Sequence, residues 1–260
     1  MEKRIRLKNY AVNVQFIQPQ AVQHGPVLVF LHEALGSIIQ WRQFPSFLCQ
    51  QQQLSGLVIE RRGHGQSDPM NAPRTKTYLH DYAEELHAVL EEVYPLGTPF
   101  ILVGHSDGAS IALIYASRYP KNVRAIISMA AHTFVEEETI AGIPPAVAAY
   151  ESGKLDGLNR IHGEKTDALF RAWSDTWQSD DFRHWDIRKE IPAINCPILA
   201  IQGINDQYGT PEQITSIEKN VTQVTTAILT DCGHHPHLEK QVEILELTAN
   251  FFRKNKSIFS

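Results

Sequence analysis

Residues 101–113 read Ile-Leu-Val-Gly-His-Ser-Asp-Gly-Ala-Ser-Ile-Ala-Leu, and the fold is built around this stretch. An apolar run typical of a strand passes through Gly-x-Ser-x-Gly into a segment with the apolar periodicity of a helix. This pattern predicts a sharp turn that holds Ser106 in a strained conformation, with its hydroxyl exposed above a sheet. We expect only glycine to fit at Gly104 and Gly108, where helix and strand pack closely. The backbone N–H of Asp107 then points to where an oxyanion would form.

A serine hydroxyl at its ordinary pKa is a weak nucleophile, so it needs an adjacent base that is itself oriented by a carboxylate. Two later loops supply these groups. Asp206 follows the strand predicted to end near Ile201, and His234 follows the strand predicted over residues 224–229. Both loops belong to the carboxyl edge of the predicted sheet, where open α/β sheets bind ligands. We therefore predict Ser106 as nucleophile, Asp206 as the orienting acid and His234 as the base.

Neighbouring residues in the same loops are given other roles. His235 precedes Pro236, which favours extended backbone at position 235, so we expect its side chain to face away from the site. His235 and His237 are interpreted as surface or capping residues. Asp231 lies in the loop that carries His234 and is interpreted as a turn former that bonds to its own backbone.

The turn at Ser106 supplies one donor to an oxyanion, and a second is expected from the loop after the first apolar run. By position, we predict the backbone N–H of Ala34. Glu33 precedes it, and a carboxylate directed into this hole would oppose the oxyanion. We expect Glu33 to turn aside and to pair with an arginine such as Arg42, Arg61 or Arg62. The alternative for Glu33 is an indirect catalytic role.

Three histidines at predicted strand ends could be mistaken for metal ligands. The spacing of His32, His105 and His132 fits no metal-binding motif, and we predict neither a metal nor a cofactor. His105 is expected to pack beneath the turn at Ser106. His132 either has a structural role or faces the substrate.

Strand and helix patterns alternate along the chain, which predicts an α/β fold with a mostly parallel sheet. Residues 3–17 are predicted to form an antiparallel hairpin at one edge. After the strand over 26–31, Trp41, Phe44, Phe47 and Leu48 are predicted to share one side of a helix. Further strands are predicted at 56–60, 101–105, 123–129 and 197–201, and further helices at 78–93, 211–219 and 238–253.

Residues 133–193 contain no strand signal and are interpreted as a helical cap inserted into the core, which comprises residues 1–132 and 194–260. The alternative is an ordinary run of surface helices. Trp173 and Trp177 of this segment, together with Glu33 and His132, are candidates for lining the substrate pocket.

The composition limits the possible partners. The formal net charge is −5, without a basic stripe, so binding to nucleic acid or to an anionic membrane has no electrostatic support. We expect a small-molecule substrate and a monomer or homodimer. Absence of a signal peptide or membrane span, and three cysteines without metal-type spacing, favour the cytoplasm.

Taken together, these motifs resemble the α/β-hydrolase fold superfamily, in its serine-nucleophile, capped branch. The matching features are the His32 loop, the glycine-rich turn at 60–67, the pentapeptide at 104–108, Gly203-x-x-Asp206 and Gly233-His234-x-Pro236. The resemblance implies eight strands with the second antiparallel, a cap after the sixth strand, and a triad of Ser106, Asp206 and His234. Glu33 stands where the family usually has glycine, and Glu60 where it usually has aspartate.

These residues and motifs predict a serine hydrolase that acts on a small acyl compound: a carboxylic ester, a lactone or a thioester. Three alternatives stay open. The same triad could hydrolyse a carbon–carbon bond of a ring-fission diketone. The pair of His234 and Asp206 could serve a cofactor-free dioxygenase. The fold could instead carry a ligand receptor with negligible turnover.

Overall fold

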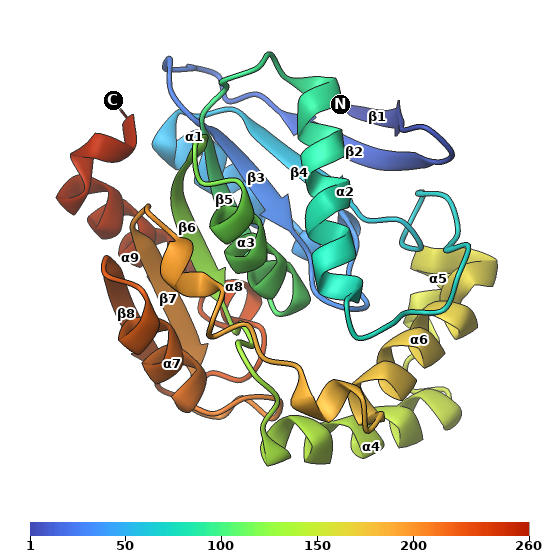
Figure 1. Cartoon of the computed structure of the whole chain (residues 1–260). Coiled ribbons are helices and arrows are strands. Elements are labelled where there is room, and N and C mark those ends of the chain that lie inside the picture. Colours follow the sequence, from blue (N-terminus) through green and yellow to red (C-terminus); the bar gives the residue numbers. More distant parts are fainter. Residues whose placement is uncertain (260) are drawn as a thin grey trace.

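The central strands are continuous apolar runs that are buried along their whole length, as expected of strands covered on both faces. The computed structural model of the chain describes residues 1–259, in which eight strands form one sheet in the order β1-β2-β4-β3-β5-β6-β7-β8 (Figure 1). The predicted α/β fold with a mostly parallel sheet is confirmed. The strands are β1 (Glu2–Arg6), β2 (Ala11–Ile17), β3 (Val27–Leu31), β4 (Gly56–Glu60), β5 (Phe100–His105), β6 (Val123–Met129), β7 (Ile198–Gly203) and β8 (Val224–Leu229).

The antiparallel part of the sheet is its first edge. β1 pairs antiparallel with β2, and β2 pairs antiparallel with β4, where Asn13 lies opposite Glu60. All pairs from β4 through β8 are parallel. The carboxyl ends of these parallel strands therefore meet at one edge of the sheet.

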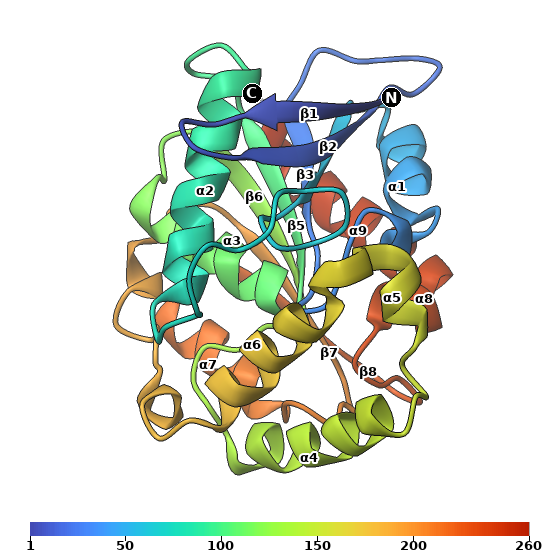
Figure 2. The same cartoon turned by 90° about the vertical axis from the view of Figure 1, so that its right-hand side faces the viewer.

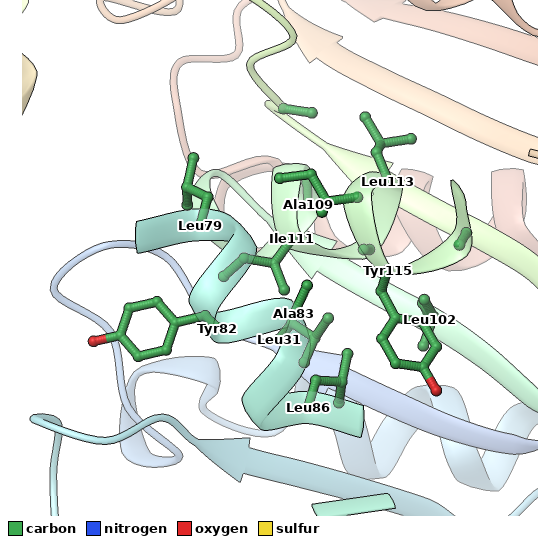
Figure 3. Packing of buried hydrophobic residues seen from close by; sticks show 14 of the residues in the cluster. Leu31, Leu79, Tyr82, Ala83, Leu86, Leu102, Ala109, Ile111, Leu113 and Tyr115 are labelled. Carbon is green, nitrogen blue, oxygen red and sulfur yellow. The ribbon is translucent and has the colours of Figure 1, made fainter. Parts of the chain in front are cut away.

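Alternate residues of each central strand belong to two different hydrophobic cores, because successive side chains point to opposite faces of a sheet. Val29 and Leu31 join the core under α2 (Tyr78–Val93) and α3 (Asp107–Arg118), which also includes residues of α7 (Glu212–Asn220). Figure 3 shows side chains of α2 and α3 packed together beside Leu31 and Leu102. Leu28 and Phe30 join the core under α1 (Phe44–Gln52) and α9 (Gln241–Lys254).

Between β6 and β7 the chain forms mostly helices, and its only strand-like pairing within the described residues is an isolated bridge from Phe134 to Asp186. Of these helices, α4 (Glu137–Glu151), α5 (Gly157–His162) and α6 (Thr166–Gln178) lie across the carboxyl end of the sheet (Figures 1 and 2). The short helices of this segment are η2 (Gly163–Lys165), η3 (Phe182–His184) and η4 (Ile191–Ala193).

Two predicted helices differ from the structure. The segment after β3 is divided into η1 (Ile39–Trp41) and α1, and Phe47 is 45% exposed instead of joining Trp41 and Phe44 in the core. The first short helix ends at Arg42, because its φ of 52° is not helical, and a new helix begins at Phe44. The C-terminal helix is also divided, into α8 (Pro236–Glu239) and α9, by the non-helical backbone of Lys240; the short η5 (Lys256–Phe259) follows.

The approach of α3 to β3 gives a stability prediction. A Cβ on Gly108 would meet the backbone carbonyl of Leu31, which cannot move without disturbing the sheet. Gly157, at the first position of α5, has no atom near its Cβ position and has no positive φ. We expect Gly108→Ala to lower the free energy of unfolding by about 3 kcal/mol or more and Gly157→Ala to change it by less than about 0.5 kcal/mol.

Urea unfolding followed by circular dichroism measures both glycine variants. Equal stability of the Gly108→Ala and Gly157→Ala proteins would contradict the close approach of α3 to β3.

Candidate active site

Ser106 occupies a strained turn between β5 and α3. Its φ of 54° and ψ of −121° lie in a region that residues with a Cβ rarely adopt. The turn is tight because α3 packs directly on the strands: a Cβ on Gly104 would meet the backbone of Gly108, and one on Gly108 would meet Leu31. Ser106 consequently stands at the N-terminus of α3, where the helix dipole favours negative charge.

The loops after β7 and β8 bring Asp206 and His234 to Ser106. His234 Nε2 lies 2.9 Å from Ser106 Oγ, and His234 Nδ1 lies 2.9 and 2.8 Å from the two carboxylate oxygens of Asp206. A carboxylate accepts, so Nδ1 carries the proton and Nε2 is left to accept from the serine hydroxyl. The three predicted residues thus form one continuous hydrogen-bonded series.

The carboxylate of Asp206 is only 1% exposed. Burial by itself raises the pKa of Asp206, but the contacts with His234 and the backbone N–H of Tyr208 outweigh it, so the pKa lies below its ordinary value. The N–H of Tyr208 donates to Asp206 over 2.8 Å, and Gln202 Nε2 donates over 2.7 Å. Asp206 is therefore ionised and fixed in orientation.

The loop that carries His234 is held from two sides. The carboxylate of Glu239 accepts from the N–H of Gly233 at 2.7 Å and from the N–H of His235 at 2.9 Å. On the opposite side, His105 Nε2 donates to the His234 carbonyl oxygen over 2.6 Å. Sequence reasoning missed Glu239. The available signal was proline at the first position of a helix with an acidic residue in the same turn.

Ala34 and Asp107 both line the cavity beside Ser106. Within residues 1–259, neither backbone N–H has a hydrogen-bond acceptor. Both N–H groups are therefore available to a ligand oxygen, which is what the predicted oxyanion donors require.

The loop before Ala34 is held by Arg61, which is buried at the end of β4. Its guanidinium donates to the carbonyls of His32 and Glu33, the latter over 2.8 Å. His64 Nε2 adds a hydrogen bond of 3.0 Å to the carbonyl of Ala34. These hydrogen bonds to three successive carbonyls fix the backbone of the loop beside the cavity.

The predicted arginine partner of Glu33 is wrong. Arg61 binds the backbone of this loop, whereas the Glu33 carboxylate faces His105, with Oε2 3.5 Å from Nδ1. Glu33 turns aside from the amide of Ala34 but still lines the cavity. Burial raises the pKa of Glu33, yet the contact with His105 outweighs it and holds the pKa well below its ordinary value. The carboxylate is therefore charged.

A cavity of about 240 Å³ opens beside Ser106 and is mostly apolar. The cavity is lined by His132, Trp173 and Trp177. His132 Nε2 donates to the carbonyl of Tyr208 over 2.8 Å. The remaining apolar wall comes from the helices between β6 and β7: Ile143, Ala146, Leu155 and Leu158.

A short hydrogen-bond series ties α6 to the turn at Ser106. Trp177 Nε1 donates to the hydroxyl of Tyr78 over 2.7 Å, and this hydroxyl donates to Asp107 Oδ2 over 2.8 Å. The position of the Asp107 carboxylate is thereby fixed.

The expectation that His235 faces away is wrong, because its side chain lines the cavity. Its N–H is held by Glu239 and Pro236 begins α8, so the ring folds back to 5.0 Å from the ring of His105. Burial lowers the pKa of His235 to about 4.

Neither a metal site nor a membrane span is found in the described part of the chain. No group of three or more His, Cys, Asp or Glu side chains in residues 1–259 could hold a metal ion. Among the same residues, no helix has the length and apolar character needed to cross a bilayer.

Comparison with known proteins agrees with this fold. A family model for the alpha/beta hydrolase fold matches residues 26–153. The sn-1-specific diacylglycerol lipase ABHD11 of Xenopus tropicalis is 23% identical over 260 residues, which cover 87% of this chain and 78% of that protein. The 2-(acetamidomethylene)succinate hydrolase of Mesorhizobium japonicum is 26% identical over 125 residues, covering 48% of this chain and only 42% of that relative.

Solved structures extend the likeness to the whole chain. The enol-lactonase of Burkholderia xenovorans LB400 superimposes with a TM-score of 0.76 at 15% identity, covering 96% of this chain and 100% of that one. The sheet, the turn at Ser106 and the helices on both faces make up the α/β-hydrolase fold. The predicted resemblance to the α/β-hydrolase fold superfamily is thereby confirmed.

The buried histidines around the site give a prediction for acid stability. Burial lowers the pKa of six of them: His32, His64, His132, His162, His235 and His237. In the unfolded chain a histidine titrates near pH 6.5. Unfolding therefore takes up protons below about pH 6.5, so the free energy of unfolding is highest above about pH 7 and falls as the pH is lowered through this window.

His162 allows this effect to be isolated. Its Nδ1 accepts from the N–H of Gly65 at 3.0 Å and its Nε2 donates to the carbonyl of Leu35 at 2.9 Å, a pairing that only the neutral ring makes. We expect His162→Gln to reduce the loss of stability between pH 7.5 and 5.5, measured by urea unfolding, and the exposed His24→Gln to leave it unchanged. Identical pH dependence in all three proteins would contradict the assignment.

Proposed function

We propose that this protein is a serine hydrolase that cleaves small acyl compounds through Ser106, His234 and Asp206. The observation that carries the proposal is the continuous series of hydrogen bonds from Asp206 through His234 to Ser106 at the mouth of an apolar cavity. The family relationship supports hydrolysis, since relatives of this chain include a lipase and a hydrolase.

The mechanism begins with attack of Ser106 Oγ on the substrate carbonyl carbon while His234 Nε2 takes the hydroxyl proton. Asp206 stabilises the imidazolium that forms. The carbonyl oxygen becomes an anion, which accepts from the N–H groups of Ala34 and Asp107. The bond to the leaving group then breaks as His234 returns the proton to it, and an acyl-enzyme is left on Ser106.

Water completes the cycle. His234, again neutral, takes a proton from water as its oxygen attacks the acyl carbon, and the second tetrahedral oxyanion uses the same two amides. Breakdown of this intermediate releases the acid and returns the proton to Ser106. No step requires a group beyond the side chains and amides named.

The cavity supports the proposed substrate class. Its apolar wall, which includes Trp173 and Trp177, favours an uncharged acyl group, and a cavity of about 150 Å³ is known to accommodate benzene. At about 240 Å³, this one suits a somewhat larger group, such as a medium aliphatic chain or a substituted ring. Carboxylic esters, lactones and thioesters of such acids are the proposed substrates, and the segment over 133–193 is proposed to act as the cap over them.

Substitutions in the triad test the roles. We expect Ser106→Ala, His234→Ala and Asp206→Asn each to lower kcat for p-nitrophenyl acetate by about 10³-fold or more, because each removes the nucleophile, its base or the orientation of that base. His235→Ala is the matched control from the same loop, and its kcat is expected to stay within about tenfold of the parent. An inactive His235→Ala protein beside an active His234→Ala protein would overturn the assignment.

Labelling with a fluorophosphonate, with the adduct located by mass spectrometry, tests the nucleophile independently of substrate. Rapid labelling at Ser106 that His234→Ala abolishes supports the proposal. Folded protein without labelling would contradict it and favour a receptor. Oxygen uptake that survives Ser106→Ala would favour the dioxygenase alternative. If Ser106 is labelled but esters are not hydrolysed, and the protein bleaches a coloured ring-fission diketone, the reaction is carbon–carbon bond hydrolysis.

The cavity also predicts how chain length is selected. Ala146 of α4 lines the apolar wall, whereas Ala148 of the same helix is not among the residues that line it. We expect Ala146→Phe to lower kcat/KM for p-nitrophenyl octanoate by about tenfold relative to p-nitrophenyl acetate, since it fills space that the longer chain needs. Ala148→Phe should leave the ratio unchanged. The same ratio in both variants would show that the acyl chain lies elsewhere.

A further inference from the structure

His105 connects the strand that carries Ser106 to the loop that carries His234. It is the last residue of β5, directly before Ser106, and it is completely buried. Its Nε2 lies 2.6 Å from the carbonyl oxygen of His234. A carbonyl oxygen only accepts, so Nε2 must carry a proton. The backbone of the proposed base is thus anchored to the strand that carries the proposed nucleophile.

The other ring nitrogen of His105 faces Glu33. Nδ1 lies 3.5 Å from Glu33 Oε2, and it is buried without a hydrogen-bond partner within residues 1–259. A bare nitrogen lone pair would repel a charged carboxylate at this distance, whereas a proton on Nδ1 would turn repulsion into attraction.

The position of the Glu33 carboxylate is set by its surroundings. A Cβ on Gly36 would come within 2.5 Å of Glu33 Oε2, so the glycine leaves the space that the carboxylate occupies. The carbonyl of Glu33 accepts from Arg61 at 2.8 Å and from the N–H of Gly36 at 3.1 Å. Backbone and side chain of Glu33 are both held, and the side chain is only 16% exposed.

We propose that Glu33 and His105 are positioning residues for His234: the carboxylate orients His105, and His105 holds the carbonyl of His234 so that its imidazole stays aligned with Ser106. The inference rests on the proposed function. It also accounts for an acidic residue beside the proposed oxyanion site, because the carboxylate is directed toward His105. Rings of His235 and His237 pack around His105 at 5.0 and 4.6 Å and complete the enclosure.

The experiment measures kcat and KM for p-nitrophenyl acetate and the rate of fluorophosphonate labelling in Glu33→Gln, His105→Gln, His105→Leu and the double variant Glu33→Gln/His105→Leu. Glu33→Gln keeps the side-chain volume, so its folding is not at issue. We expect kcat and the labelling rate to fall about tenfold in Glu33→Gln and up to about a hundredfold in His105→Leu, with KM nearly unchanged, as for outer partners of other active-site histidines.

Two features distinguish positioning from a general loss of structure. His105→Gln retains an N–H that can reach the His234 carbonyl, so we expect it to recover part of the activity lost in His105→Leu. Because Glu33 acts through His105, adding Glu33→Gln to His105→Leu should cause no further loss, and the double-mutant cycle should show strong coupling. Glu190→Gln breaks another histidine–carboxylate pair, with His80 at 3.0 Å, and is the matched control with unchanged kcat.

Several results would overturn the proposal. One is a kcat in Glu33→Gln equal to that of the parent protein. Another is a tenfold loss of kcat when Glu33→Gln is added to His105→Leu, equal to the loss that Glu33→Gln causes in the parent. A rise in KM at constant kcat would make Glu33 a substrate contact instead. These outcomes require a parent protein that labels at Ser106 and turns over esters, so failure of the proposed function, which appears in the parent itself, is told apart from failure of this inference.

Discussion

The close approach of α3 to β5 and β3 is the constraint on which the site depends. It forces a φ of 54° on Ser106, a conformation that costs about 1–3 kcal/mol. Burial of α3 side chains such as Ile111 and Leu113 offsets this cost, since each fully buried aliphatic side chain contributes about 1.5–3 kcal/mol. The strain is thus supported by the core, and it leaves the hydroxyl and the amide of Asp107 on the same side of the turn.

The parallel arrangement of β5 to β8 brings loops that are far apart in the sequence close together in space. β5, β6, β7 and β8 are neighbours in the sheet and end at the same edge, so the loops that follow them meet there. This is why residues separated by 128 positions, Ser106 and His234, come within 2.9 Å. The helices between β6 and β7 cover the same edge, and the cavity between them and Ser106 is apolar because α4 and α6 turn their apolar sides inward.

The charged groups beneath this edge each have a polar partner. Asp206 accepts from His234, Glu33 faces His105, and the guanidinium of Arg61 binds the carbonyls of the loop before Ala34. Buried charge without such partners would cost several kcal/mol. The pairing therefore lets carboxylates lie close to a site where negative charge is proposed to develop, and it fixes the backbone around that site.

The sequence by itself determined the strands, the turn at Ser106 and the order of the loops that carry Asp206 and His234. These features depend on local patterns: apolar runs, the glycines around Ser106, and loops directly after strands. Only the tertiary structure decided which side chains meet. Glu33 faces His105 instead of an arginine, His235 turns into the cavity, Phe47 faces solvent, and Glu239 holds the loop of His234. Such contacts join residues far apart in the chain, or depend on where a helix breaks, and a pattern of hydrophobicity carries neither.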